Sequence, residues 1–324
     1  MPTRHQMQSS PFFGPDGRLH PILRLLLYFI ATPTAVIVLQ VVAEVIVAST
    51  IGKPNQGPAN LGELGYPSLL IFQLASVVAI TCTTLAACRL LEGRSLVSLG
   101  LRLGGSWLVD VLFGLLLGLL LMGLVFILEW WAGWMTWRPT PAGLSLTNLI
   151  GAVILFAMVA WGEELATRGY VLQTIAGAWG ALPAAIVTSL LFSILHLGNR
   201  GANVMSVLGI FMAGVFFAVA FLATRSLWLP MAVHFSWNFF EGPVFGFPVS
   251  GLQLPSLLSV TPTGPELVTG GVFGPEAGLS GLLASCVGIA VVAAYWKWLK
   301  RRPRQAGITA DTTWSSVDRK HAPD

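Results

Sequence analysis

Long, uninterrupted apolar runs constrain the fold of this chain more than any other feature. Each approaches or exceeds the roughly 20 residues that an α-helix needs to cross about 30 Å of hydrocarbon. The strands of a membrane barrel would instead alternate apolar and polar residues over segments of about ten. We therefore predict an all-α, polytopic transmembrane helical bundle with about eight spanning helices. The predicted spans are residues 22–50, 67–91, 107–132, 146–174, 181–197, 203–223, 227–245 and 278–299.

Charged residues make up only 10% of the chain, against about 25% in a soluble domain, which excludes an ordinary soluble enzyme. We expect a cytoplasmic tail at residues 1–21, one transmembrane helical domain at 22–300, and a basic, disordered tail at 301–324. The interval 246–277 is rich in Gly and Pro, which predicts a long loop or a re-entrant segment. The three cysteines fall inside apolar runs and show no CxxC spacing, so they indicate no disulfide framework.

The basic residues predict the orientation, because cytoplasmic loops of membrane proteins carry an excess of Lys and Arg. If the spans alternate, fifteen of the 18 basic residues fall on the side of both termini, leaving Lys53, Arg138 and Arg200 opposite. We therefore expect cytoplasmic N- and C-termini in a bacterial-type plasma membrane. The net charge of +4 is concentrated in the tails, which indicates the lipid bilayer as a partner and requires no nucleic acid. The fifteen are Arg4, Arg18, Arg24, Arg89, Arg94, Arg102, Arg168, Arg225, Lys297, Lys300, Arg301, Arg302, Arg304, Arg319 and Lys320.

Polar residues at membrane depth carry the functional information. An ionisable group in the middle of a spanning helix costs about 2.5–3.5 kcal/mol on insertion scales, so such residues need a structural or chemical reason. They gather in three segments, "GEELATRGY" (162–170), "LLFSILHLGN" (190–199) and "MAVHFSWNFF" (231–240).

Helical geometry separates the roles of the two adjacent glutamates. Glu164 and Arg168 are four residues apart with the acid nearer the N-terminus, which favours an ion pair. Glu163 is turned about 100° from that face. We therefore predict a supporting pair of Glu164 and Arg168, and a chemical role for Glu163. The alternative for Glu163 is an interfacial carboxylate that reaches water.

Two histidines and an amide complete the candidate site. His234 and Asn238 are four residues apart and share one helical face, where they form a polar patch in an apolar helix. His196 lies near the end of its apolar run, where a lone histidine is more often interfacial than catalytic. Together with Glu163 these side chains would line a hydrophilic cavity inside the bundle.

This set of residue types suits acyl hydrolysis. A carboxylate beside an imidazole can activate water as a general base, and a second imidazole with an amide can stabilise an oxyanion. Neither G-x-S-x-G nor HExxH occurs in the sequence. One Glu and two His also form a possible zinc set. The spacing leaves open whether Glu163, His196 and His234 act directly or hold a divalent metal such as zinc.

Three motifs occur in order on successive apolar runs: Glu-Glu-x-x-x-Arg (163–168), Phe-x-x-x-His (192–196) and His-x-x-x-Asn (234–238). Over about residues 146–245 the chain resembles the CAAX protease and bacteriocin-processing (CPBP, or Abi) family of intramembrane proteases, which includes the type II CAAX prenyl endopeptidases.

The resemblance implies an endopeptidase that acts on a membrane-anchored peptide or protein. By this resemblance Glu163 and His196 would activate water, His234 and Asn238 would stabilise the oxyanion, and Glu164 with Arg168 would support the site. The resemblance does not decide whether a metal takes part. It also leaves two substrate classes, a prenylated CAAX protein and a bacteriocin-like peptide.

Two other classes of function remain to be weighed against a protease. A membrane transporter also places polar residues at the midplane, but it would predict an inverted repeat, and none is visible in the sequence. A non-catalytic scaffold or bacteriocin-immunity protein would tolerate the loss of Glu163 and His196 if stability were kept.

Overall fold

The computed structural model describes residues 12–13, 18–50, 65–140 and 144–301. The predicted C-terminal tail beyond Arg301, most of the predicted N-terminal tail and Lys53 lie outside these residues. The described chain is a helical bundle with a single small sheet, which confirms the predicted all-α class.

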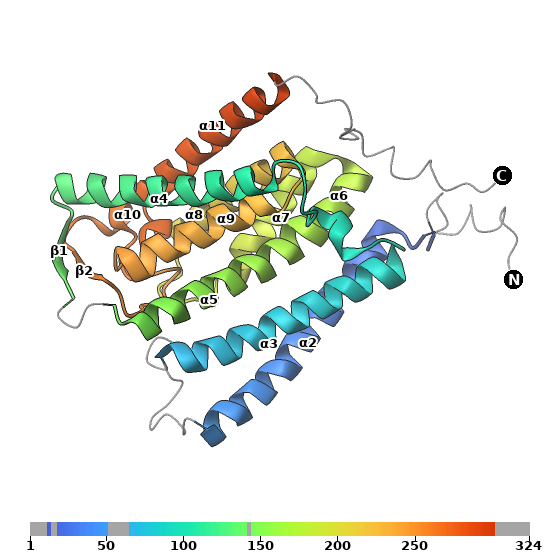
Figure 1. Cartoon of the computed structure of the whole chain (residues 1–324), viewed down its shortest axis with the longest axis horizontal. Helices are drawn as coiled ribbons and strands as arrows, with labels where there is room; N and C mark the ends of the chain where they lie inside the picture. Colours follow the sequence, from blue (N-terminus) through green and yellow to red (C-terminus); the bar gives the residue numbers. More distant parts are fainter. Residues whose placement is uncertain (1–11, 14–17, 51–64, 141–143, 302–324) are drawn as a thin grey trace, which may run out of the picture.

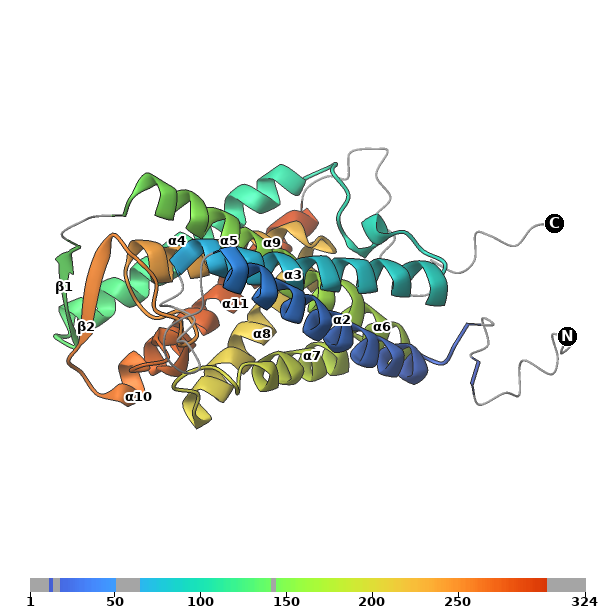
Figure 2. The ribbon, with the colours of Figure 1, turned by 90° about the horizontal axis from the view of Figure 1, so that it is seen from below.

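Eight principal helices run back and forth between two ends of the bundle (Figures 1 and 2). Three of them include a π-helical segment: Ala87–Leu91 follows α3, Leu165–Val171 joins α5 to α6, and Phe240–Val244 follows α9. Their α-helical parts in the described residues are α2 (Pro21–Thr50), α3 (Gly65–Ala86), α4 (Trp107–Trp131), α5 (Leu146–Glu164) continued by α6 (Leu172–Trp179), α7 (Ala181–Leu195), α8 (Val204–Thr224), α9 (Trp228–Phe239) and α11 (Leu279–Arg301).

The two ends of the bundle differ, and we name them by what they contain. The terminal end holds the connections 92–106 and 225–227, the start of α2 and the end of α11 (Figure 1). There the backbone N–H of Leu227 donates to the carbonyl of Gly100 at 3.0 Å. The sheet end holds the strands β1 and β2 with the described residues 132–140 and the connections 196–203 and 245–278 (Figure 2).

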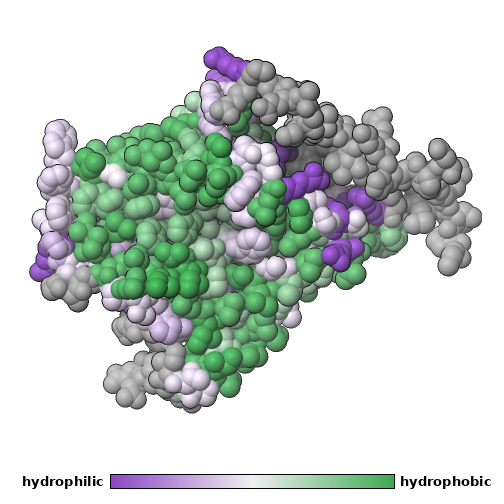
Figure 3. Space-filling model, viewed as in Figure 1, coloured by the Kyte–Doolittle hydropathy of each residue, from purple (hydrophilic) through white to green (hydrophobic). Residues whose placement is uncertain are grey.

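Six helical stretches among the described residues are long and apolar enough to cross a membrane. Their outward faces are apolar, as expected of helices in lipid, and hydrophobic residues cover the visible flank of the bundle (Figure 3). This confirms an integral membrane protein. Two predicted spans, 181–197 and 227–245, correspond to the shorter helices α7 and α9, so the bundle is not built from eight spans of equal length.

Small residues let the central helices approach closely, as is common where helices pack in lipid. A Cβ atom added at Gly118 of α4 would lie 2.6 Å from Cβ of Ser236 in α9. One added at Gly214 of α8 would lie 2.9 Å from Cα of Ser189 in α7. These two contacts hold α9 and α7, which carry candidate site residues, against the rest of the bundle.

The interval 246–277, predicted as a long loop or a re-entrant segment, is a long connection with short elements of secondary structure and no helix long enough to cross a membrane. It contains β2 (Leu258–Pro262), which pairs antiparallel with β1 (Met135–Pro139), the short helix α10 (Glu266–Thr269) and a 3-10 turn at Pro275–Ala277. The sequence did not predict these strands, because their pairing joins segments more than 100 residues apart. We call residues 246–277 the closing segment, since it folds over the sheet end.

Candidate active site

The candidate residues come from three helices that meet inside the bundle. Glu163 and Glu164 end α5, His196 caps the C-terminus of α7, and His234 and Asn238 lie on α9. Along straight helices of equal length these side chains would sit at different depths. The structure brings His196, His234 and Glu163 together in the lining of one cavity, so the three helices are placed at offsets that align these side chains.

Glu164 connects Arg168 to His234. Its Oε1 accepts a hydrogen bond from Nη1 of Arg168 at 2.8 Å and lies 3.0 Å from Nδ1 of His234. Since an ionised carboxylate only accepts, Nδ1 of His234 donates this bond. The ion pair expected between Glu164 and Arg168 is present, and its link to His234 was not anticipated from the sequence.

The Arg168 guanidinium is fully buried and contacts several elements. It donates to the carbonyl of Gly214 on α8 at 2.9 Å and to Oγ1 of Thr167 at 2.9 Å. Its Cζ also lies 4.6 Å from the centre of the Phe192 ring and 5.3 Å from that of Phe217, within cation–π range. Arg168 thereby ties α7, α8 and α9 to the end of α5.

The Phe of the Phe-x-x-x-His motif packs between the polar groups. Phe192 lies 4.7 Å from the ring of His196 and 6.2 Å from that of His234, measured between ring centres. On its other side the His234 ring stacks on Phe217, with ring centres 4.7 Å apart. Aromatic packing therefore holds both imidazoles in fixed orientations.

Glu163 turns away from the buried pair and toward open space. Its carboxylate is about one-third exposed, and Oε2 lies 3.7 Å from Nε2 of His234. That oxygen has no hydrogen-bond partner among the described residues. A π-helical segment begins directly after the two glutamates, at Leu165. Such segments frequently occur at functional sites.

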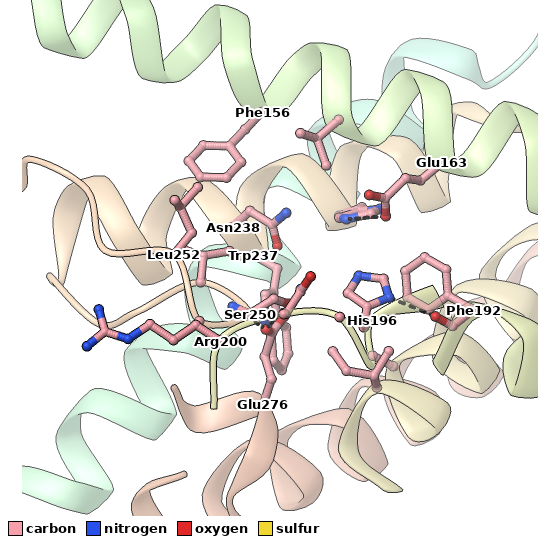
Figure 4. Close-up of a pocket in the computed structure, with 18 of the residues that line it drawn as sticks. Phe156, Glu163, Phe192, His196, Arg200, Trp237, Asn238, Ser250, Leu252 and Glu276 are labelled. Carbon is pink, nitrogen blue, oxygen red and sulfur yellow. Dashed lines mark hydrogen bonds and ion pairs between the residues drawn. The ribbon is translucent and has the colours of Figure 1, made fainter. Parts of the chain in front are cut away.

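His196 presents its second nitrogen to the same space. Nδ1 lies 2.7 Å from the carbonyl oxygen of Phe192, which can only accept, so Nδ1 carries a proton and Nε2 is left as an acceptor in the neutral ring. The family resemblance pairs Glu163 with His196 in activating water. The structure brings His234 within 4 Å of Glu163 instead, while Glu163 and His196 face a shared space (Figure 4).

These residues line one cavity of about 600 Å³. Asn238 is buried in its wall, and its carboxamide makes no hydrogen bond with another described residue. The wall combines apolar side chains with the candidate polar residues (Figure 4). Its lining includes Phe156, Glu163, Phe192, His196, Arg200, Phe217, His234, Asn238, Ser250, Gln253 and Glu276.

Glu276 is the second carboxylate that lines this cavity, beside Glu163, and sequence reasoning missed it. It is buried, and its Oε2 accepts hydrogen bonds from the backbone N–H of Ser250 at 2.8 Å and from the Ser250 hydroxyl. Burial raises the pKa of the Glu276 carboxyl, while those hydrogen bonds and the nearby His196 and His234 oppose the shift. A single acid in a Gly- and Pro-rich interval offered no signal, because only tertiary folding brings the closing segment to the site.

The possible zinc set does not assemble in this structure. Within residues 12–13, 18–50, 65–140 and 144–301, no group of three or more His, Cys, Asp and Glu side chains is arranged to hold a metal ion. Of Glu163, His196 and His234, the first and last lie within 4 Å of each other. Among the described residues, no ion pair of 4 Å or less joins Glu163 to His196.

Comparison with known families supports the assignment suggested by the motifs. Residues 145–240 match the model of the type II CAAX prenyl endopeptidase Rce1-like family. The match confirms the predicted family resemblance and supports a membrane protease of the CAAX type in general. It covers all three motifs and ends before the closing segment. No curated protein sequence matches the chain.

Proposed function

We propose that this chain, similar over residues 145–240 to type II CAAX prenyl endopeptidases, is an intramembrane endopeptidase that hydrolyses a peptide bond of a membrane-associated polypeptide. The observation that carries the proposal is the meeting of Glu163, His196, His234 and Asn238 in the wall of one cavity. A carboxylate, two imidazoles and a carboxamide around one space are the groups that peptide hydrolysis needs.

Glu163 acts as the general base. Its carboxylate faces the cavity, and Oε2 has no described hydrogen-bond partner. A water molecule between the exposed part of the Glu163 carboxylate and Nε2 of His196 would donate to both, because both are acceptors. Glu163 takes one proton while the water oxygen attacks the carbonyl carbon. A positioned general base contributes about 10²–10⁴ in rate.

Asn238 and His234 stabilise the resulting oxyanion. The Asn238 carboxamide can donate directly. For His234 to donate from Nε2 while Nδ1 donates to Glu164, the ring must carry both protons. Glu163 and Glu164 lie at its two nitrogens and offset that charge. Collapse of the intermediate breaks the C–N bond, and the amine nitrogen takes the proton held by Glu163.

Orientation in the membrane forms part of the proposal. The excess of Lys and Arg on the side of both termini supports an N- and C-terminus in the cytoplasm. The proposed location is a bacterial-type plasma membrane, and the proposed substrate is a prenylated CAAX-type or a bacteriocin-like polypeptide. A reporter fused after Arg301 is expected to be active in its cytoplasmic form, and activity of its periplasmic form would contradict this orientation.

The central test is cleavage of a membrane-anchored peptide by purified protein in liposomes. Glu163→Gln keeps shape and hydrogen bonding but removes the base, so it should lower the cleavage rate by about 10²–10⁴ with an unchanged thermal midpoint. The matched control is Glu44→Gln, which neutralises an exposed carboxylate on α2 and should cleave normally. Cleavage by Glu163→Gln at the wild-type rate would rule out this active site and favour a scaffold.

A further inference from the structure

The cavity reaches exposed residues at one end of the bundle. Among its lining residues Gly198, Arg200 and Gln253 are exposed, whereas His234 and Asn238 are buried. We call the first three the mouth of the cavity. All three mouth residues belong to connections at the sheet end, 196–203 and 245–278. The path to the candidate catalytic groups therefore begins at the sheet end.

Tight packing holds the mouth in this position. A Cβ atom at Gly251 would lie 2.2 Å from the carbonyl oxygen of Arg200, so the closing segment rests directly on the connection between α7 and α8. The N–H of Gly251 also donates to the carbonyl of Phe273 at 2.7 Å. Gly251, Arg200 and Phe273 all belong to connections at the sheet end of the bundle.

Charge distinguishes the two ends of the described chain. Among the described residues, Arg138 and Arg200 are the Lys or Arg residues at the sheet end, and Arg138 lies on β1. Hydrophilic residues gather toward the terminal end in Figure 3. The basic residues there include Arg24, Arg89, Arg94, Arg102, Arg225, Lys297, Lys300 and Arg301. By the positive-inside rule the terminal end is cytoplasmic and the sheet end is not.

We infer that the cavity opens to the extracytoplasmic face of the membrane, and that its substrates are segments of exported, membrane-anchored polypeptides presented from that face. The inferred substrate class rests on the proposed peptidase function. The inferred position of the opening does not, because it follows from the geometry and the charge distribution. A polypeptide confined to the cytoplasm would have to carry unsatisfied backbone groups through the hydrocarbon to reach the mouth, which is energetically costly.

Cysteine labelling in intact cells tests the geometry without any need for activity. Cys82, Cys88 and Cys286 are first replaced by Ser, and single cysteines are then introduced by Thr261→Cys on β2, Gln253→Cys at the mouth and Gly104→Cys at the terminal end. A membrane-impermeant maleimide should label Thr261→Cys and Gln253→Cys in intact cells, and Gly104→Cys only after permeabilisation. Labelling after denaturation measures the total protein.

Two labelling results would overturn the inference. If Gly104→Cys reacts in intact cells and Thr261→Cys does not, the orientation is reversed. If Thr261→Cys reacts but Gln253→Cys remains protected, the sheet end is outside but the cavity does not open there.

A paired reporter tests the substrate class. One membrane-anchored peptide is displayed on the extracytoplasmic side and an identical one is retained in the cytoplasm. We expect cleavage of the displayed form alone, lost with Glu163→Gln. Cleavage of the retained form alone would overturn the substrate class. A failure of both reporters, with labelling as expected, would count against the proposed peptidase rather than against the extracytoplasmic opening.

Discussion

Nδ1 of His234 lies 3.0 Å from Oε1 of Glu164, the same oxygen that accepts a hydrogen bond from Arg168 at 2.8 Å. Glu164 thus joins His234, a residue of the candidate oxyanion site, to the buried guanidinium of Arg168. A substitution at Arg168 should therefore affect both the stability of the bundle and the orientation of His234.

The first prediction concerns this buried pair. Arg168→Ala leaves the carboxylate of Glu164 buried without its cation, which typically costs about 3–5 kcal/mol. Glu163→Ala removes a partly exposed carboxylate and should cost much less. Thermal unfolding in detergent should give a clearly lower midpoint for Arg168→Ala. Equal midpoints for the two variants would contradict the structural role of the pair.

The second prediction concerns the oxyanion. Asn238→Ala removes one donor that acts in the transition state, and loss of such a donor costs on the order of 10²-fold in kcat. We expect a smaller loss than for Glu163→Gln, because His234 remains, and a KM close to that of the wild type. Asn148→Ala, at the start of α5, serves as the control. A change confined to KM would assign Asn238 to substrate binding instead.

The third prediction concerns the support of α9 by α4. Gly118→Val would place a side chain against Cβ of Ser236 and the backbone nitrogen of Trp237, and overpacking of this kind typically costs about 1–3 kcal/mol. A Cβ atom at Gly123, on the same helix, meets nothing within 4 Å. Gly118→Val should lower the thermal midpoint and the cleavage rate, whereas Gly123→Val should change neither. Similar effects from both variants would point to general helix propensity.

The fourth prediction concerns pH. Burial raises the pKa of the Glu276 carboxyl above its ordinary value of 4.5, so the folded state holds this proton more tightly than the unfolded state. Its contribution to stability is present below about 4.5 and is lost as pH rises through the raised pKa. Relative to wild type, Glu276→Gln should therefore become more stable as pH rises above 4.5. A difference in thermal midpoint that does not vary with pH would contradict this account.

The fifth prediction concerns the metal. Because Glu163, His196 and His234 do not form a three-ligand cluster, a chelator should leave cleavage by the purified protein unchanged. The control is a zinc-dependent protease inactivated under the same conditions. Loss of cleavage on chelation with recovery on added zinc would favour the metal-assisted alternative that the sequence left open.

The family resemblance and the helical bundle followed from sequence because their signals are local. Apolar runs near 20 residues long predict spanning helices without knowledge of their neighbours. The i, i+4 spacing of Glu164 and Arg168 likewise predicts a contact within one helix, and the side chains do meet. The direct partner of Glu163 could not be predicted in this way, because it depends on how α7 and α9 are placed against α5.

Only the tertiary structure decided where the site opens and what closes it. Three contacts at this end join segments that are separated in the chain. They are the pairing of β1 with β2, the hydrogen bonds from Ser250 to Glu276, and the packing of Gly251 against Arg200. No periodic pattern marks such contacts, because they arise from backbone hydrogen bonds and close packing between segments rather than from the hydrophobicity of any one segment. The sequence thus determined which residue types were available for the proposed chemistry, and the packing of α5, α7 and α9 determined that these residues line one cavity.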